Sequence, residues 1–262
     1  MMEGKMIKVG IFGATGRIGR LLIESLSNDR EAQLSSVFVR NELQFSIPEG
    51  VLVTNDIKVF VESSDLIIDF SSPEATQNLL DCAIDNCAKP IVIGTTGLND
   101  MQKDLLCAAS QKMPILYASN MSRGIVVLNN IAEIVATALR ESDIEIVEIH
   151  HHHKKDSPSG TALTLANNVA KARGLNIDKV RISGRDGAIG ERKSDEIGVM
   201  SLRGGDIVGR HTIGFYMDGE YLELTHNATS RLTFAKGAIN VGKWLVKQEC
   251  GLYDIKDALA LN

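Results

Sequence analysis

The chain has 262 residues, of which 44% are apolar and 23% charged, and its formal net charge at pH 7 is -5. The apolar fraction can bury a core large enough to offset the entropy of ordering the chain, which argues against intrinsic disorder. The excess of acidic over basic side chains argues against the broad positive surface that nucleic acid requires, so we expect no nucleic-acid partner.

The apolar segments are too short for a membrane span of roughly 18 residues. The first eight residues carry Glu3, Lys5 and Lys8 in place of the apolar core of a secretory signal. We therefore expect a cytoplasmic protein with no membrane partner.

Cysteines are too few for a disulfide framework in a chain of this length. We expect buried, reduced thiols at Cys82, Cys87, Cys107 and Cys250.

Short apolar runs alternate with helically patterned stretches from residue 6 to residue 116, which is typical of a parallel sheet covered by helices. Predicted strands are Ile7–Phe12, Leu34–Val39, Asp65–Phe70, Ile91–Ile93 and Ile115–Tyr117. Ser72-Pro73-Glu74 has the hydroxyl, proline and acid of a helix start. The pattern predicts an α/β fold with a doubly wound parallel sheet.

Strands follow strands after Asn120. A helix predicted at Val126–Arg140 leads into strands at Ile144–Ile149, Ile197–Leu202, Ile207–Ile213 and Tyr221–Thr225, which predicts a second, α+β domain on a mixed sheet. A last helix, at Phe234–Val246, could return to the first sheet. We place the domain boundary near Met121, so the expected domains are 1–121, completed by 231–262, and 122–230.

Between Gly10 and Gly19 every third residue is glycine, where the first strand meets the first helix. Such glycines permit a tight turn and a close approach to a pyrophosphate, whose charge is met by N–H groups at the helix N-terminus. A simple turn with close helix packing is the alternative. The strand-turn-helix context favours nucleotide binding.

The second strand ends in Phe38-Val39-Arg40, without the acid that usually binds the adenosine ribose in such folds. Arg40, together with Arg17, is suited to a 2′-phosphate, which favours NADP(H) over NAD(H). An exposed arginine without a ligand is the alternative.

Two further strand ends, Gly94–Gly97 and Ala118–Met121, carry small and hydroxyl residues. Ligands bind at the carboxyl ends of parallel strands, so these segments could admit a nicotinamide ring and its ribose. When each segment is judged alone, a plain loop followed by the helix cap at Asn99 is an equally good interpretation.

A run of four histidines opens the segment His150–Ala162, which reads HHHHKKDSPSGTA. Its internal position excludes an expression tag. Side chains along a strand alternate faces, so consecutive histidines do not converge on one zinc ion, and we expect no metal. Imidazoles, Lys154 and a helix N-terminus at Ser159 offer cationic donors and N–H groups suited to a carboxylate substrate and to proton transfer. A solvated basic loop is the alternative.

The stretch Glu145–Ala162 resembles the signature of the 4-hydroxy-tetrahydrodipicolinate reductase family, also called dihydrodipicolinate reductase. Further matches fall in the family's order at Gly13–Gly19, Asp69–Ser71, Ile93–Gly97, Ala118–Asn120, Gly205–Gly209 and Ser230–Ala235. The resemblance implies a Rossmann-like cofactor domain completed by C-terminal helices, an inserted substrate-binding and oligomerisation domain, and a homotetramer.

The resemblance also implies reduction, by NADPH or NADH, of a cyclic imine dicarboxylate in lysine and diaminopimelate biosynthesis, giving tetrahydrodipicolinate. His150 would donate or accept a proton, and Lys154 would donate one. The substrate carboxylates would be held by His151, Lys154, Gly160 and Thr161. The cofactor would be held by Gly13, Ala14, Thr15, Gly16, Arg17, Ile18, Gly94, Thr95, Thr96, Ala118, Ser119, Asn120 and Met121.

Three expectations depend on single positions. A strand that continued straight through His151 would turn His150 and His151 to opposite faces, so we predict that it ends or twists there. Val39 stands where family members that use NADH well are expected to carry an acid, so we predict a preference for NADPH. His152 and His153 match no role and are expected to be exposed.

Other functions fit parts of the sequence. A two-domain aspartate or homoserine dehydrogenase, or a dinucleotide sensor without catalysis, would explain the first domain equally well. Neither accounts for the segment from His150 to Thr161. A metal-buffering protein built around the histidines is a further alternative, which titration with zinc followed by cofactor binding would separate from the enzyme.

Overall fold

The computed structural model describes residues 5–41 and 43–261, which divide into two compact units. The first unit comprises the chain before residue 124 together with the chain from residue 231 onward, and the second comprises Gly124–Ser230. No helix in the described ranges is long and apolar enough to cross a membrane.

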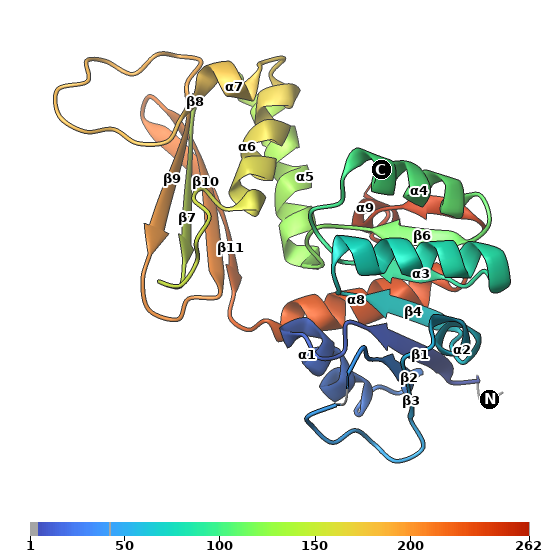
Figure 1. Cartoon of the computed structure of the whole chain (residues 1–262). Coiled ribbons are helices and arrows are strands. Elements are labelled where there is room, and N and C mark those ends of the chain that lie inside the picture. Colours follow the sequence, from blue (N-terminus) through green and yellow to red (C-terminus); the bar gives the residue numbers. More distant parts are fainter. Residues whose placement is uncertain (1–4, 42, 262) are drawn as a thin grey trace. The chain divides into compact units, whose positions relative to one another are not determined.

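The first unit is built on a seven-stranded parallel sheet (Figure 1) with the order β12-β6-β5-β4-β1-β2-β3. Its strands are β1 (Ile7–Phe12), β2 (Ala32–Phe38), β3 (Leu52–Thr54), β4 (Leu66–Asp69), β5 (Ile91–Ile93), β6 (Pro114–Tyr117) and β12 (Gly251–Tyr253). The five predicted strands are confirmed. The sequence did not predict β3 and β12, because each is only three residues long and lacks a buried run.

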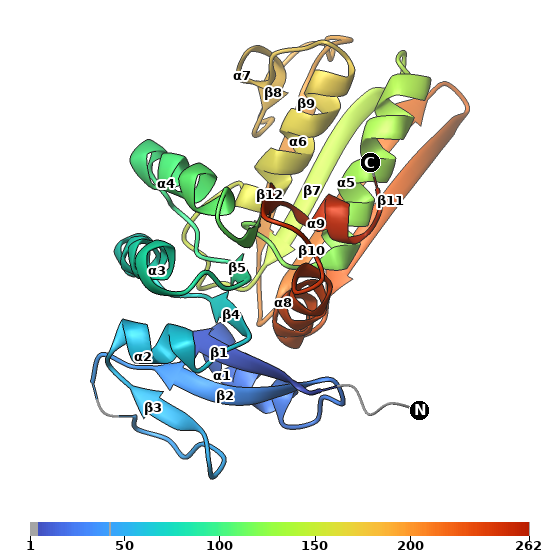
Figure 2. The same cartoon turned by 90° about the vertical axis from the view of Figure 1, so that its right-hand side faces the viewer.

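Helices cover both faces of this sheet (Figure 2), as a doubly wound fold requires. One face carries α1 (Arg17–Leu26) and α8 (Leu232–Leu245), and the other carries α2 (Ile57–Glu62), α3 (Pro73–Asn86) and α4 (Asp100–Ser110). A short α9 (Ile255–Ala258) follows β12. The predicted return of the last helix is confirmed, since α8 contacts β4, β5 and β6.

The helix starts follow their local sequence. The Ser72 hydroxyl accepts a hydrogen bond from the Ala75 N–H at the start of α3, as predicted. Asn99 and Gln102 form a reciprocal capping box at the start of α4. The two capped helices are the ones that follow β4 and β5 in the chain.

The second unit is a mixed sheet with helices on one face (Figure 1), ordered β11-β10-β7-β9-β8. Its elements are α5 (Arg123–Ala138), β7 (Asp143–His150), α6 (Gly160–Ala172), α7 (Ile177–Val180), β8 (Arg181–Ile182), β9 (Ile197–Arg203), β10 (Gly209–Met217) and β11 (Glu220–Ala228). β7 pairs parallel with β9 and antiparallel with β10, which confirms the mixed sheet. Ile146 and Ile213 of the sheet pack with Leu165 and Val169 of α6 in the core.

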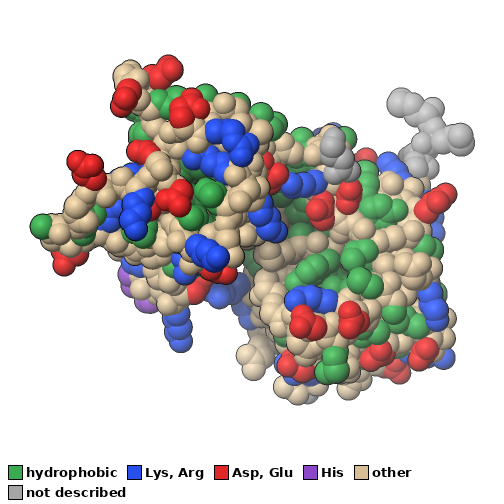
Figure 3. Space-filling model, turned by 90° about the horizontal axis from the view of Figure 1, so that it is seen from above, with side chains coloured by type: hydrophobic (Ala, Val, Ile, Leu, Met, Phe, Trp, Pro, Cys, Tyr) green, Lys and Arg blue, Asp and Glu red, His purple; other side chains and the backbone are tan. Residues whose placement is uncertain are grey.

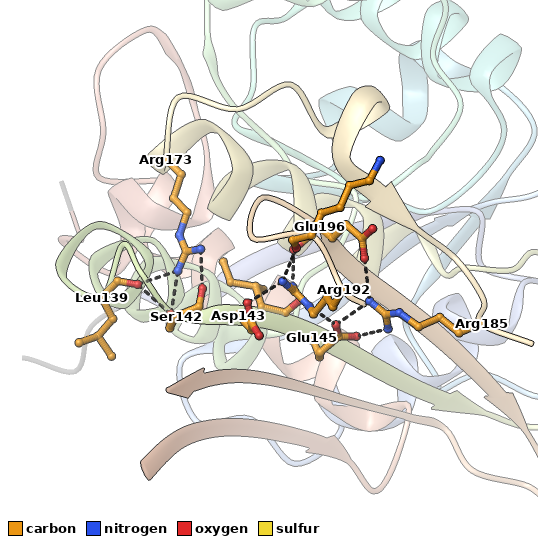
Figure 4. Close-up of polar contacts among 10 residues, drawn as sticks. Leu139, Ser142, Asp143, Glu145, Arg173, Arg185, Arg192 and Glu196 are labelled. Atoms are coloured by element: carbon orange, nitrogen blue, oxygen red, sulfur yellow. Dashed lines mark hydrogen bonds and ion pairs between the residues drawn. The ribbon is translucent and has the colours of Figure 1, made fainter. Parts of the chain in front are cut away.

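A long loop between β8 and β9 is tied to β7 by ion pairs (Figure 4). The Glu145 carboxylate accepts two hydrogen bonds from Arg185, at 3.0 and 2.9 Å, and one from Arg192, at 3.1 Å. Arg192 also donates to Asp143 at 2.6 Å. Gly198 leaves room for this carboxylate, because a Cβ there would overlap a Glu145 oxygen at 1.8 Å.

The expectation of buried cysteines is wrong. Cys82 and Cys87 are half-buried, and Cys107 and Cys250 are exposed, all four as free thiols. Cys107 lies on the solvent side of α4, whose buried side is formed by Leu106 and Ala109. Helical spacing, and not the residue type, decided its exposure.

Candidate active site

The residues expected to hold a cofactor follow the carboxyl ends of strands in the parallel sheet. The glycine turn follows β1, Arg40 follows β2, Gly94–Thr96 follows β5 and Ala118–Met121 follows β6. Because all these strands are parallel, their carboxyl ends lie at one edge of the sheet, where open α/β sheets bind ligands.

Two glycines of the turn are required by close backbone contacts. Gly13 has a φ of +90°, and a Cβ there would lie 2.4 Å from the Phe70 carbonyl oxygen. A Cβ on Gly19 would lie 2.3 Å from the Gly13 carbonyl oxygen. The turn after β1 therefore packs tightly against the backbone that follows β4, and α1 begins immediately after this turn.

The start of α1 is suited to an anion. Gly16, its N-cap, provides no side-chain cap, and the first turn carries no acidic residue. The backbone N–H groups and the positive end of the helix dipole thus meet no carboxylate from the helix itself, which is the chemistry of a pyrophosphate site.

Asp69, which was not predicted as a site residue, organises the end of β4. It is fully buried and accepts hydrogen bonds from the Ser71 hydroxyl at 2.6 Å, the Ser71 N–H at 2.9 Å and the Thr76 hydroxyl. Burial raises its pKa to about 6, against the effect of hydrogen bonds from Ser71, Thr76 and Thr95. An acid at the end of an otherwise apolar strand was the available signal.

The other expected cofactor residues differ in exposure. Thr95 is buried, and its hydroxyl accepts from the Ser71 N–H at 3.0 Å, whereas Thr96 and Ser119 are exposed. Met121 is buried, with only 1% of its surface exposed.

Both arginines considered for a 2′-phosphate, Arg17 and Arg40, are exposed. Val39, just before Arg40, is buried and donates its N–H to the Thr54 carbonyl at 3.0 Å.

In the second unit, β7 ends at His150, which confirms that the strand stops before His151. The His151 N–H donates to the Ile207 carbonyl at 2.7 Å, and the Lys154 N–H donates to the His151 carbonyl at 3.1 Å, so the chain turns here. His152 and His153 are exposed, as predicted. Figure 3 shows histidine side chains at the surface of this unit beside lysine and arginine side chains.

A buried charge cluster surrounds His150. Its Nδ1 lies 2.6 Å from an oxygen of Glu148, which is fully buried two residues earlier on the same face of β7. Arg203 of β9 donates two hydrogen bonds of 2.8 Å to Glu148. Burial raises the pKa of Glu148, but Arg203 and His150 outweigh it and lower the pKa to about 2. The carboxylate is therefore ionised at neutral pH.

The pKa of His150 is lowered, with burial as the main cause. Glu148 raises it in part, while the positive charges of Lys154 and Arg203 lower it further. A neutral imidazole with a proton-accepting nitrogen is thus available near neutral pH, and protonation makes it an acid.

Beside His150 lies His211 of β10, with ring centroids 5.1 Å apart. The His211 Nε2 and the Ser159 hydroxyl are 3.1 Å apart, and that hydroxyl also accepts from the Ala162 N–H as the N-cap of α6. Burial and the nearby His150 lower the pKa of His211 to about 4, so it is neutral at pH 7.

The expected carboxylate-binding residues lie around this cluster. α6 begins at Gly160 and has no acidic residue in its first turn, with Gly160 exposed and Thr161 half-buried. The Lys154 ammonium lies 2.9 Å from Asp156, which is itself mostly exposed. Glu148, Arg203 and His211 were not predicted from the sequence. Glu148 could have been found from the alternation of side chains along the strand, which places it on the same face as His150. Arg203 and His211 could not, because only the pairing of β9 and β10 with β7 brings them near His150.

Across residues 5–41 and 43–261, no group of three or more His, Cys, Asp and Glu side chains could hold a metal ion. The arrangement instead offers an ionised carboxylate, imidazoles and an ammonium, which together suit acid-base chemistry on an anionic substrate.

Comparison with known families identifies both units. Residues 7–121 match the family model for the N-terminus of dihydrodipicolinate reductase, and residues 124–259 match the model for its C-terminus. The chain belongs to the dihydrodipicolinate reductase family. A 4-hydroxy-tetrahydrodipicolinate reductase of Helicobacter hepaticus is 65% identical over 256 residues, covering 98% of this chain and 100% of that protein. The same enzyme of Wolinella succinogenes is 62% identical with equal coverage.

Among solved structures, a dipicolinate-bound dihydrodipicolinate reductase from Paenisporosarcina sp. TG-14 has the same fold, with a TM-score of 0.79 at 24% identity. It covers 95% of this chain, which covers 97% of it. Membership of the dihydrodipicolinate reductase family confirms the predicted fold class, the oxidoreductase class and the reductase function in lysine and diaminopimelate biosynthesis. The N-terminal half is the nucleotide-binding part of such enzymes, which use NAD(P)H.

Proposed function

We propose that this chain uses NADPH to reduce the cyclic imine dicarboxylate formed when 4-hydroxy-tetrahydrodipicolinate loses water, with His150 and Lys154 as its proton-transferring groups. The observation that carries the proposal is the hydrogen bond from His150 to the buried carboxylate of Glu148, next to Lys154 and the start of α6. This cluster pairs acid-base groups with donors for carboxylates.

The glycine turn fits a dinucleotide. Gly13 and Gly19 make contacts that no Cβ allows, and the start of α1 presents N–H groups without a carboxylate of its own. In the proposal Gly13–Ile18 hold the pyrophosphate, while Gly94–Thr96 and Ala118–Met121 hold the nicotinamide end at the same sheet edge. Bound NADPH supplies the hydride.

An exposed Arg40 and an apolar Val39 at the end of β2 support a preference for NADPH over NADH. A guanidinium binds a 2′-phosphate by charge-assisted hydrogen bonds, and no carboxylate from Val39 repels that phosphate. NADH is the weaker of the two cofactors in this proposal.

Substrate carboxylates need donors, which this cluster provides. His151, Lys154 and the Gly160–Thr161 start of α6 supply a ring nitrogen, an ammonium and backbone N–H groups. Lys154 pairs with Asp156, but an ion pair with so exposed a partner is weak and easily exchanged. The relative from Paenisporosarcina sp. TG-14 is described as dipicolinate-bound, which supports a cyclic dicarboxylate as the ligand class.

The reaction needs one proton for each hydride. Hydride addition to the conjugated ring leaves an electron pair on the substrate, and that pair takes a proton as tetrahydrodipicolinate forms. In the proposal this single proton is donated by Lys154 or by the protonated ring of His150, and the donor then accepts a proton from water. A positioned acid of this kind accelerates such a step by about 100-fold to 10,000-fold.

We further infer a cytoplasmic homotetramer assembled through the second unit. Support comes from the family resemblance and from exposed apolar side chains on this unit's sheet, among them Leu202 and Tyr221. Analytical ultracentrifugation would measure the assembly directly.

A coupled assay tests the function. A synthase makes the unstable substrate from pyruvate and aspartate semialdehyde, and oxidation of NADPH or NADH is followed by absorbance for the wild type and for His150→Gln. We expect oxidation that requires the synthase, proceeds with the higher kcat/KM for NADPH, and falls at least about 100-fold in the variant. The variant should still bind NADPH.

The opposite result is equally clear. If the wild type binds NADPH but oxidises none of it in the presence of the synthase product, the proposal is wrong, and a different dehydrogenase or a dinucleotide sensor becomes the better interpretation. Equal rates for wild type and His150→Gln would remove His150 from the reaction.

A further inference from the structure

Glu148 is a fully buried carboxylate whose position depends on three partners from different segments. Its oxygens accept from both terminal nitrogens of Arg203 at 2.8 Å, from the Ser159 N–H at 3.1 Å and from the His150 ring at 2.6 Å. Arg203 also donates to the Asp156 carbonyl at 2.7 Å. The carboxylate is thus held in place from β9 and from the loop before α6.

An ionised carboxylate can only accept hydrogen bonds. The His150 nitrogen facing it, Nδ1, therefore carries the proton in that contact. A neutral imidazole has one protonated nitrogen, so Nε2 is left with its lone pair. The carboxylate selects one tautomer and also fixes the plane of the ring.

We propose that Glu148 is a positioning residue, which holds His150 with Nδ1 protonated so that Nε2 is the atom that exchanges a proton with the substrate. The kinetic part of this inference rests on the proposed function. The structural part, which concerns the tautomer and orientation of His150, does not.

The surroundings of Nε2 agree with such a role. Gly209 lies close to this nitrogen, since a Cβ added there would lie 3.0 Å from Nε2. A residue with a side chain would thus crowd the nitrogen that the proposal assigns to proton exchange.

Charged and titratable groups face His150 from each neighbouring element. Glu148 on its own strand favours the protonated ring, whereas Arg203 of β9 and Lys154 of the following turn disfavour it. His211 of β10, with a pKa of about 4, adds no charge near neutral pH. Glu148 is the one group in this set that stabilises an imidazolium. It therefore stabilises the charged ring by its negative charge and orients the neutral ring by accepting the Nδ1 proton.

The experiment is a pH titration of His150 by nuclear magnetic resonance, with its ring signals assigned from the spectrum of His150→Gln. In wild type we expect ring nitrogen shifts of the Nδ1–H tautomer above the titration midpoint. In Glu148→Gln we expect a mixture of tautomers and a midpoint at lower pH by about one unit or more, because the stabilising negative charge is gone.

Glu145→Gln is a matched control. Glu145 lies on the same strand and also accepts two hydrogen bonds from an arginine, but strand alternation places it on the opposite face from His150. This variant should leave the tautomer and the midpoint of His150 unchanged. An unchanged His150 titration in Glu148→Gln, or an equal shift in Glu145→Gln, would overturn the proposal.

Kinetics separate this inference from the proposed function. In the coupled assay, the limb of the pH-rate profile that disappears in His150→Gln should move to lower pH in Glu148→Gln, with kcat lowered more than KM is raised. A merely structural role would lower the amount of active protein without moving the limb. A moved titration in a chain with no reductase activity would refute the function and leave the positioning role intact.

Glu148→Gln removes the ion-pair partner of Arg203, which keeps its hydrogen bond to the Asp156 carbonyl, and this variant could fail to fold. Glu148→Asp retains the charge and withdraws it by one methylene, and it serves as the second variant. We expect the Nδ1–H tautomer to persist in Glu148→Asp with a smaller shift of the midpoint. Full tautomer loss in a folded Glu148→Asp, with a midpoint equal to that of wild type, would contradict the proposed role of the charge.

Discussion

Gly237 of α8 lies directly against the Met121 backbone, so closely that a Cβ on Gly237 would come within 1.9 Å of the Met121 carbonyl oxygen. This contact joins the returning helix to the segment after β6, which is part of the expected cofactor edge. The helix can pack there only because position 237 has no side chain.

Gly237→Ala should therefore destabilise the first unit. Alanine alone would stabilise an exposed helix by about 1 kcal/mol relative to glycine, whereas overpacking costs about 1 to 3 kcal/mol. We expect a lower midpoint of urea unfolding and weaker NADPH binding. Asn240→Ala, at an exposed position of the same helix, is the control and should change neither. A stabilised Gly237→Ala would show that the contact relaxes without cost.

Glu145 anchors the loop before β9, and Glu145→Gln should release it. The substitution removes the charge that holds Arg185 and Arg192. We expect faster limited cleavage by trypsin after Arg185, Arg192 and Lys193, with little change in the unfolding midpoint. Glu191→Gln replaces an exposed acid in the same loop and should leave the cleavage rate unchanged. Equal cleavage of Glu145→Gln and wild type would mean that the backbone alone holds the loop.

Gly209 borders His150 Nε2, and Gly209→Ala should slow turnover. The added methyl group, 3.0 Å from Nε2, must displace the ring or the strand by a few tenths of an ångström. Misplacement of a catalytic group is costly, and we expect kcat to fall by about 10-fold or more. Gly204→Ala adds the same methyl group where nothing lies within 4 Å and is the control. Unchanged kcat in Gly209→Ala would show that Nε2 does not face the substrate.

Acid should destabilise the chain through His211. Its pKa is about 4 in the folded chain against a usual 6.5. Between these two pH values His211 is protonated in the unfolded chain but not in the folded chain. The free energy of unfolding is therefore unaffected by this group above pH 6.5. It falls as the pH drops from 6.5 towards 4, by about 3 kcal/mol at most.

Asp69 has the opposite effect on the free energy of unfolding over a similar pH range. Its pKa is raised to about 6, so as the pH falls the folded chain binds this proton at a higher pH than the unfolded chain does. The difference between wild type and His211→Gln removes the contribution of Asp69. We expect urea unfolding of His211→Gln to lose less stability than wild type between pH 7 and pH 4. Parallel stability curves for the two proteins would contradict the low pKa of His211.

Arg40→Ala tests the cofactor preference. Loss of a charge-assisted hydrogen bond worth about 1.5 to 3 kcal/mol should raise the KM for NADPH about 10-fold or more and leave the KM for NADH unchanged. Arg30→Ala is the control, because Arg30 is exposed but precedes β2 and lies at the opposite edge of the sheet. A higher kcat/KM for NADH than for NADPH in wild type would refute the preference itself.

Local patterns in the sequence predicted much of this structure. Apolar runs marked the buried strands, the cap at Ser72 marked the start of α3, and the glycines marked the turn after β1. Each of these signals comes from neighbouring residues, because helix caps, strand periodicity and turns depend on backbone geometry over a few residues. The segment from His150 to Thr161 was also visible as a candidate site, since its chemistry lies in consecutive side chains.

Other features depend on residues far apart in the chain. The short strands β3 and β12 form because each pairs with a longer strand at an edge of the sheet. Cys107 is exposed because it lies on the side of α4 that faces away from the sheet. Arg203 reaches Glu148 across 55 residues because β7 and β9 pair in parallel.

The sequence by itself determined the longer elements, the order of the strand-end loops, the family and the candidate residues that the proposal assigns to substrate binding. Only the tertiary structure decided that Glu148 is buried against His150, that Arg203 and Ser159 hold it there, and that Asp69 organises the end of β4. The reason is physical: a buried charge is tolerated only where partners from other strands and loops surround it, and those partners are chosen by strand pairing and packing.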